Sequence, residues 1–115
     1  MFLDFHILGL SFILLHELDA IRCKEWRIFP GLSALDDRMG FIVFTFLHVP
    51  LFYWVLAALQ VNNTAFRAGF DYFLIIHLGL HILFLWHPKN EFKDWVSWSI
   101  IVGAALFGGL DLVMR

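Results

Sequence analysis

The chain has 115 residues, of which 61% are hydrophobic and 16% are charged, and its formal net charge is −2. Soluble domains carry ~25% charged residues, and a chain this short cannot bury so much apolar surface in one core. These values exclude a disordered or fibrous protein and indicate an integral membrane protein in a lipid bilayer. The absence of a basic excess argues against a nucleic-acid partner. The single cysteine, Cys23, excludes an internal disulfide framework and a cysteine-based metal site.

Four apolar blocks follow one another along the chain, each with the ~17–25 residues that a membrane-spanning helix needs. Residues that break helices lie between them, at Pro30–Gly31, Asn62–Asn63 and Pro88. Short connections favour antiparallel neighbours. We therefore expect an all-α integral membrane protein, an up-down four-helix bundle that forms a single transmembrane domain over residues 1–115. The predicted spans are residues 2–21, 41–59, 70–86 and 95–113.

The loop between the first two spans has a pattern of its own. Its apolar residues Ile28, Phe29, Leu32 and Leu35 are interleaved with charged ones. This pattern predicts a short interfacial helix beneath the bundle.

Lysine and arginine residues are divided unevenly between the two ends of the predicted bundle. Six lie on the side of the first and third loops and two on the opposite side. Because cytoplasmic loops carry the excess of positive charge, we expect both termini to lie outside the cytoplasm. The six are Arg22, Lys24, Arg27, Arg38, Lys89 and Lys93, and the two are Arg67 and Arg115.

Ionisable residues inside a bilayer are costly unless they are paired, so each marks a functional candidate. At ~1.5 Å per residue, those of the first three spans fall in the cytoplasmic half of the bilayer. His77 and His81 are four residues apart and share a helix face. The residues of this layer are His16, Glu17, His48, His77 and His81, with Asp19 beside them.

This layer of residues predicts a divalent metal site, and the bound metal could also serve catalysis. Glu17 or Asp19 would serve as a further ligand or as a general base. Imidazole and carboxylate ligands suit zinc and iron alike, so the sequence leaves the metal open. The predicted metal ligands are His16, His48, His77 and His81.

Two other functions fit the same residues. Histidines from two helices could hold a haem b, with His48 and His81 as axial ligands. The third alternative involves no catalysis, and the protein would then be a proton or ion relay or an accessory subunit of a membrane complex. A visible spectrum and a metal analysis of the purified protein separate these functions.

The polar residues at the outer ends of the spans have simpler explanations. His6 lies near the outer surface, where a hydrogen bond between helices accounts for it. Asp71 suits the N-terminal end of a helix electrostatically. Asp111 lies near a helix C-terminus, where a carboxylate is disfavoured, so we expect it to pair with Arg67 or Arg115.

The fourth span carries a patch of small residues, which permits close approach of another helix. The partner helix could belong to this chain or to a second copy in a homo-oligomer. The patch includes Ala104, Ala105, Gly108 and Gly109.

The segment 16–37 reads HELDAIRCKEWRIFPGLSALDD and is followed by Leu47-His48-Val49-Pro50. With this motif the chain resembles a family of small bacterial integral membrane proteins of unknown function. The resemblance covers most of the chain. It implies the multi-pass architecture and a location in the bacterial inner membrane, and it implies no activity.

Overall fold

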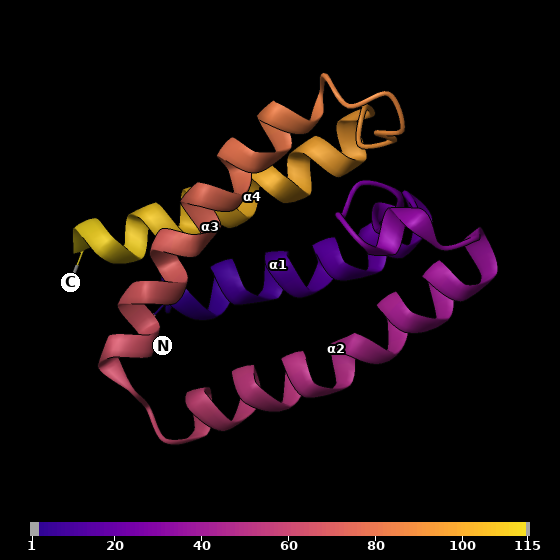
Figure 1. Ribbon diagram of the computed structural model, residues 1–115. Helices are drawn as coiled ribbons and strands as arrows, with labels where there is room; N and C mark the ends of the chain where they lie inside the picture. The colour runs from indigo at the N-terminus through magenta and orange to yellow at the C-terminus, as the bar shows by residue number, and fades with distance from the viewer. Residues whose placement is uncertain (1–2, 115) are drawn as a thin grey trace.

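The computed structural model describes residues 3–114, which form helices and loops without a strand (Figure 1). The long helices are α1 (Phe5–Arg22), α2 (Asp37–Gln60), α3 (Thr64–Phe84) and α4 (Trp95–Met114). Two short 3-10 helices, η1 (Glu25–Arg27) and η2 (Leu32–Ala34), lie between α1 and α2. The predicted all-α, four-helix class is confirmed for the described residues. Phe2, where the first span was predicted to begin, and Arg115 lie outside them.

Polar caps fix where three of the helices begin. The side chains of Asp4, Asp36 and Asn63 each accept a hydrogen bond from the backbone N–H three residues later. Such caps satisfy N–H groups that the first helical turn leaves without partners. As a result, α2 begins at residue 37 rather than 41, and α3 begins at residue 64 rather than 70.

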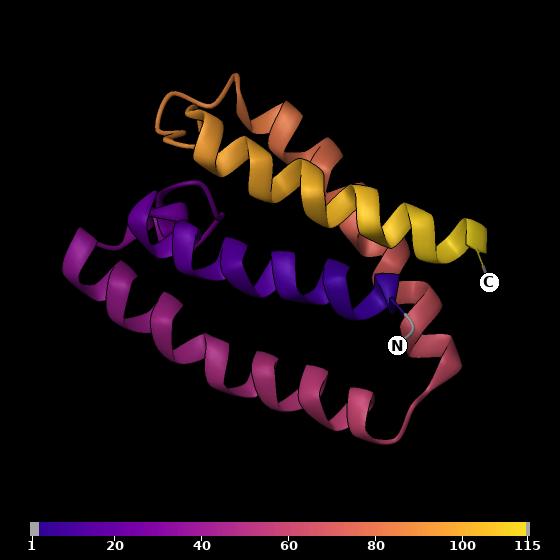
Figure 2. The same ribbon diagram turned by 180° about the vertical axis from the view of Figure 1, so that it is seen from behind.

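Successive helices run in opposite directions, as predicted, but their packing does not follow chain order. In both ribbon views α4 lies alongside α1 and α3, and α2 lies on the far side of α1 (Figures 1 and 2). The closest packing joins α1 to α4 and α3 to α4, while α2 contacts chiefly η1 and η2. The core is therefore built on α1, α3 and α4.

Glycines let these three helices approach closely. A Cβ on Gly9 would lie 2.8 Å from the Leu74 side chain, and one on Gly108 would lie 3.0 Å from the Asp71 carbonyl oxygen. The small face of α4 thus serves packing within the chain, and self-association through it stays a prediction. Of the four patch residues, Ala104, Ala105 and Gly108 are buried and Gly109 is half-buried.

Three helices, α2, α3 and α4, are long and apolar enough to cross a membrane. The sequence predicted four such spans. The 18-residue helix α1 differs from the others because it carries Glu17, Asp19 and Arg22. Only 11% of the most apolar stretch of α2 is buried within the chain, so this helix needs apolar surroundings to cover it.

The first loop folds under the bundle as two short turns, not as the single interfacial helix that was predicted. Trp26 is buried and packs in one cluster with Phe44 of α2 and with Phe92. Gly40 makes room for it, because a Cβ there would overlap the indole ring. This packing fixes η1 against the end of α1 and places Glu25 in the interior.

Candidate metal centre

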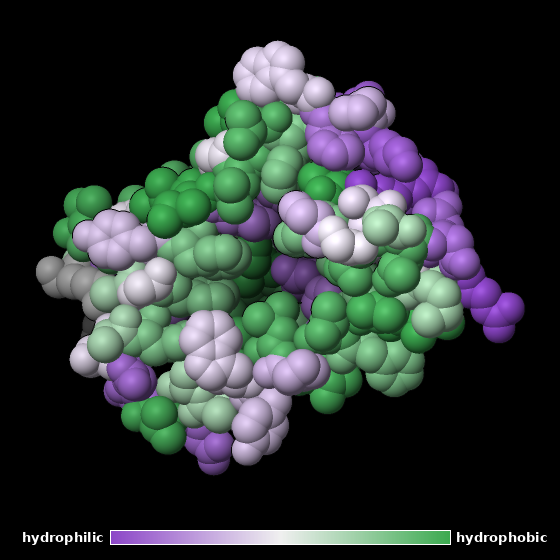
Figure 3. All heavy atoms as spheres, viewed as in Figure 1, coloured by the Kyte–Doolittle hydropathy of each residue, from purple (hydrophilic) through white to green (hydrophobic). Residues whose placement is uncertain are grey.

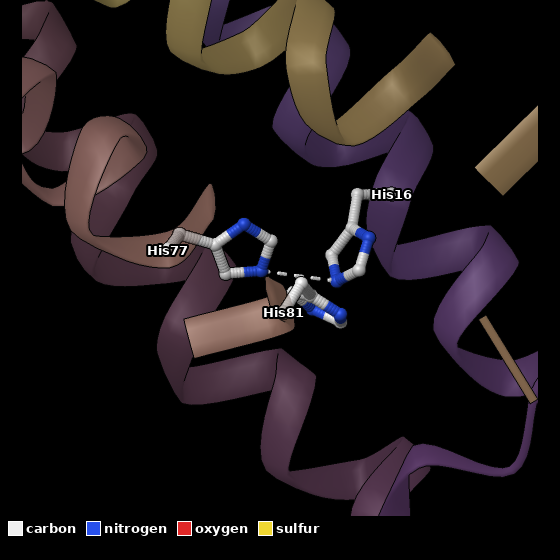
Figure 4. A group of neighbouring side chains, drawn as sticks. All are labelled: His16, His77 and His81. Carbon is white, nitrogen blue, oxygen red and sulfur yellow. Dashed lines mark hydrogen bonds between the residues drawn. The ribbon is translucent and has the colours of Figure 1, made fainter. Parts of the chain in front are cut away.

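Three histidines from two helices meet in the interior, near the end of the bundle that holds the first loop. His16 comes from α1, and His77 and His81 come from successive turns of α3 (Figure 4). Their ring centroids are 4.4, 4.8 and 4.5 Å apart. One nitrogen from each ring can be chosen so that all three lie within 4.8 Å of one another. We call these residues the tri-histidine group.

Most ring nitrogens of this group have no hydrogen-bond partner among the described residues. His16 Nε2 and His77 Nε2 lie 3.2 Å apart. The other four ring nitrogens, namely Nδ1 of all three residues and Nε2 of His81, are buried and unpaired. Buried polar atoms are nearly always paired, so this concentration of unpaired nitrogens is unusual.

A carboxylate joins the group from the first loop. Glu25 is 6% exposed, and its Oε2 lies 3.3 Å from His16 Nε2 without an aligned hydrogen bond to any described group. Sequence reasoning did not assign Glu25 to the site, because the residue lies outside the predicted spans. The sequence feature that could have indicated Glu25 is its position next to Trp26, because the burial of Trp26 brings the loop into the interior.

The distances between these ligand atoms match the separations of neighbouring ligand atoms around a metal ion. Zinc binds imidazole nitrogen and carboxylate oxygen at ~2.0–2.2 Å in tetrahedral geometry, which places neighbouring ligand atoms ~3.3 Å apart. The His16–His77 nitrogen pair, at 3.2 Å, and the His16–Glu25 pair, at 3.3 Å, both have this separation. The three imidazoles therefore form a group suited to a metal ion, with the Glu25 carboxylate beside His16.

Aromatic packing holds the imidazole rings in place. The Phe92 ring stacks on His16 at 5.4 Å and meets the edge of His81 at 4.6 Å. Phe84 contacts the same His81 ring at 5.3 Å. His81 is only 1% exposed and is enclosed by other aromatic rings, and the haem alternative stays a prediction.

The fourth predicted histidine ligand, His48, lies apart from the tri-histidine group and pairs with Glu17. His48 Nδ1 is 2.7 Å from the Phe44 carbonyl oxygen and must donate to it, because that oxygen only accepts. His48 Nε2 is 2.5 Å from Glu17 Oε2. A contact this short needs a proton between the two atoms, so the pair holds a proton, either on the imidazole or on the carboxyl.

Asp19, predicted as a catalytic residue with Glu17, has its oxygens engaged elsewhere. Its Oδ1 accepts from Arg22 at 2.7 Å, and its Oδ2 accepts from the Ser97 hydroxyl at 2.5 Å. Asp19 therefore ties the end of α1 to the start of α4. The carboxylate near the imidazoles is Glu25 instead.

A cavity of about 350 Å³ connects the tri-histidine group with the Glu17–His48 pair. Figure 3 shows a hollow on this face of the molecule, with hydrophilic atoms at its floor and mostly hydrophobic residues around it. Its polar lining residues are Glu17, Glu25, His48, His77 and His81, and the rest of its wall is apolar.

A second buried polar cluster lies at the opposite end of the bundle. His6 Nδ1 is 2.9 Å from Asp71 Oδ1, and Arg67 donates two hydrogen bonds to Asp111, at 3.0 and 2.6 Å. The predicted pairing of Asp111 with Arg67 is confirmed. His6 is 2% exposed, and its contact with Asp71 is the predicted hydrogen bond between two helices, α1 and α3. We call His6, Arg67, Asp71 and Asp111 the terminal cluster.

The comparisons with known proteins identify a family without a known activity. No curated protein and no solved structure matches the chain. A family model does match, over residues 3–115, and its description is "Family of unknown function (DUF6713)". The chain belongs to this family of unknown function.

Proposed function

We propose that this protein binds a divalent transition metal, zinc or ferrous iron, through His16, His77 and His81. The Glu25 carboxylate, beside His16, would balance part of the charge of the ion. The observation that carries the proposal is the convergence of three buried imidazoles, with one nitrogen of each ring within 4.8 Å of the others. A metal ion would bind one nitrogen of each ring.

The setting that we propose is the bacterial inner membrane. The exposed apolar side chains of α2 support it, among them Phe46 and Tyr53, which are 69% and 76% exposed. In this arrangement α1 also crosses the membrane, in addition to α2, α3 and α4. It packs on α4 with its ionisable groups turned into the protein. Both termini would lie outside the cytoplasm, as the charge bias predicts. A reporter that is active only in the cytoplasm, fused after Arg115, should therefore stay inactive, and an active fusion would reverse this orientation.

Metal analysis of the purified protein tests the metal site. After growth with zinc, iron and manganese, we expect about one metal ion per chain, the stoichiometry of a single tri-histidine site. His16→Ala and His81→Ala should each lower the bound metal at least ~10-fold, because even outer-shell changes cost that much affinity. The matched control is His87→Ala, since the His87 side chain accepts from the backbone N–H of Lys89 in the third loop and does not belong to the tri-histidine group.

Two results would contradict the proposal. Stoichiometric metal in the His16→Ala/His77→Ala/His81→Ala variant would place the ligands elsewhere. A wild-type protein whose only metal is haem iron, identified by a strong visible haem band, would favour His48 and His81 as axial ligands. A protein with neither metal nor haem would favour the proton relay or the accessory subunit. The Glu17–His48 pair, with its shared proton, is the observation that supports the relay as second candidate.

A further inference from the structure

The cavity beside the tri-histidine group has more apolar wall than a closed metal site requires. Leu47 and Leu51 of α2 and Phe73 and Leu80 of α3 line it. A metal that only stabilises the fold is normally enclosed by its ligands. Here a space of about 350 Å³ remains beside the ligands, which is within the ~300–1,000 Å³ range of small-molecule sites.

The position of the cavity indicates that it is reached from the lipid side. It lies between α2 and α3, both of which are long and apolar enough to cross a membrane. Leu47 and Leu80, one from each helix, are 53% and 40% exposed. Phe29 and Leu32 of the first loop line the same cavity. A molecule dissolved in the bilayer would therefore meet apolar side chains first and the polar floor last.

The floor of the cavity presents two kinds of polar group. The tri-histidine group would hold the metal on one side, and the Glu17–His48 pair lies on the other. The proton of the pair lies between His48 Nε2 and Glu17 Oε2, and His48 Nδ1 donates to the Phe44 carbonyl oxygen, so the polar head of a ligand would bind at the metal. Carboxylates and acyl carbonyl derivatives provide the oxygen ligand that zinc and iron accept.

We propose that the cavity binds a single-chain amphiphile of the fatty-acyl class, which enters from the bilayer between α2 and α3. A head-group oxygen binds at the metal, and the chain lies against the leucine and phenylalanine wall. The cavity volume is at the lower end of the range for ligand sites, so it suits one hydrocarbon chain rather than a two-chain phospholipid. This inference rests on the proposed metal site.

The test uses Co²⁺ as a spectroscopic probe, with the full chain in phosphatidylcholine nanodiscs. Dodecanohydroxamate and acetohydroxamate have the same metal-binding head and differ only in chain length. We expect the long probe to change the visible Co²⁺ spectrum at a concentration at least ~10-fold lower than the short probe. Because a long chain also concentrates in the lipid, the decisive comparison is between two variants of α3.

Leu80→Trp fills the cavity wall, whereas Leu83→Trp changes a residue that is 62% exposed and does not line the cavity. We expect Leu80→Trp to weaken the response to the long probe at least ~10-fold and to leave Co²⁺ binding and the response to the short probe unchanged. Leu83→Trp should behave as wild type.

The possible failures are distinguishable. If the wild-type protein binds no Co²⁺, the metal site and this inference both fail. If Co²⁺ binds normally and Leu80→Trp responds to the long probe as Leu83→Trp does, the proposed metal site stands and the amphiphile site is refuted. Should Leu80→Trp fail to fold, Leu51→Trp on the α2 wall of the same cavity replaces it, and a wild-type response of that variant to the long probe would equally refute the amphiphile site.

Discussion

Both ends of the bundle bury histidine and carboxylate side chains. The two ends differ in whether these side chains find hydrogen-bond and charge partners within the chain. In the terminal cluster, His6 has Asp71 as its partner and Arg67 supplies a cation to Asp111. In the tri-histidine group, four ring nitrogens have no partner within the described residues. Both clusters contain three groups able to hold a metal, so residue type alone does not separate them.

The difference shows which buried polar clusters indicate a ligand. A buried charge is tolerated when the chain itself supplies the counter-charge, as Arg67 does. The terminal cluster is therefore explained by joining α1, α3 and α4, the helices that carry its members. At the other end of the bundle, four ring nitrogens have no hydrogen-bond partner among the described residues, and the cation that we propose there would bind one nitrogen of each ring.

The largest effect is expected from breaking the terminal cluster. Arg67→Met keeps much of the side-chain length and removes the cation, which leaves the buried Asp111 carboxylate without its bidentate partner. The free energy of unfolding should fall by ~3–5 kcal/mol, measured by denaturant titration in mild detergent. The metal content of the folded fraction should stay at the wild-type value.

A different pair of results would assign the metal to the terminal cluster instead. Arg67→Met protein that stays as stable as wild type and loses its metal would show that the terminal cluster holds the ion. A double variant, Arg67→Met/Asp111→Asn, serves as the control. It removes the carboxylate charge that Arg67 balances in the wild type, so it should recover part of the lost stability.

Removal of the metal should have the next largest effect, at the other end of the bundle. At a free metal concentration 100 times the dissociation constant, binding adds ~2.7 kcal/mol to stability. A chelator should therefore lower the melting temperature of the wild type and of Arg67→Met, and leave that of His81→Ala unchanged. An equal shift in His81→Ala would mean that the chelator acts on something other than the tri-histidine group.

Much of the fold could be predicted from the sequence, because it depends on apolar runs and turn residues. The lengths of the apolar blocks indicated four antiparallel helices, and depth along the helices placed His16, His77 and His81 in one layer. The pairing of α1 with α4 was not predictable from chain order. It depends on close contacts at Gly9 and Gly108. These contacts can be predicted only when the helix faces that pack together are known.

The parts of the site that escaped prediction depend on side-chain direction and on loop path. Asp19 lies three residues from His16 on the same helix, yet it turns to Arg22 and Ser97. His48 has the expected depth but bonds to Glu17. Glu25 enters the interior because the buried Trp26 holds η1 under the bundle, a tertiary effect that no spacing rule contains.

The smallest effect concerns Asp94, an exposed residue at the start of α4 near the tri-histidine end. Its side chain accepts from the backbone N–H of Ser97 at 2.9 Å and lies 3.1 Å from the Arg22 guanidinium. These contacts hold the pKa of Asp94 below its ordinary value.

A lowered pKa in the folded state means that the carboxylate stabilises the protein above pH ~4, and that this contribution disappears as pH falls through the folded-state pKa. Asp94→Asn should thus be slightly less stable than wild type at neutral pH, and the two stability curves should converge on acidification, measured by thermal unfolding between about pH 6 and pH 3. A constant difference across that range would assign the effect to the changed cap and not to the charge.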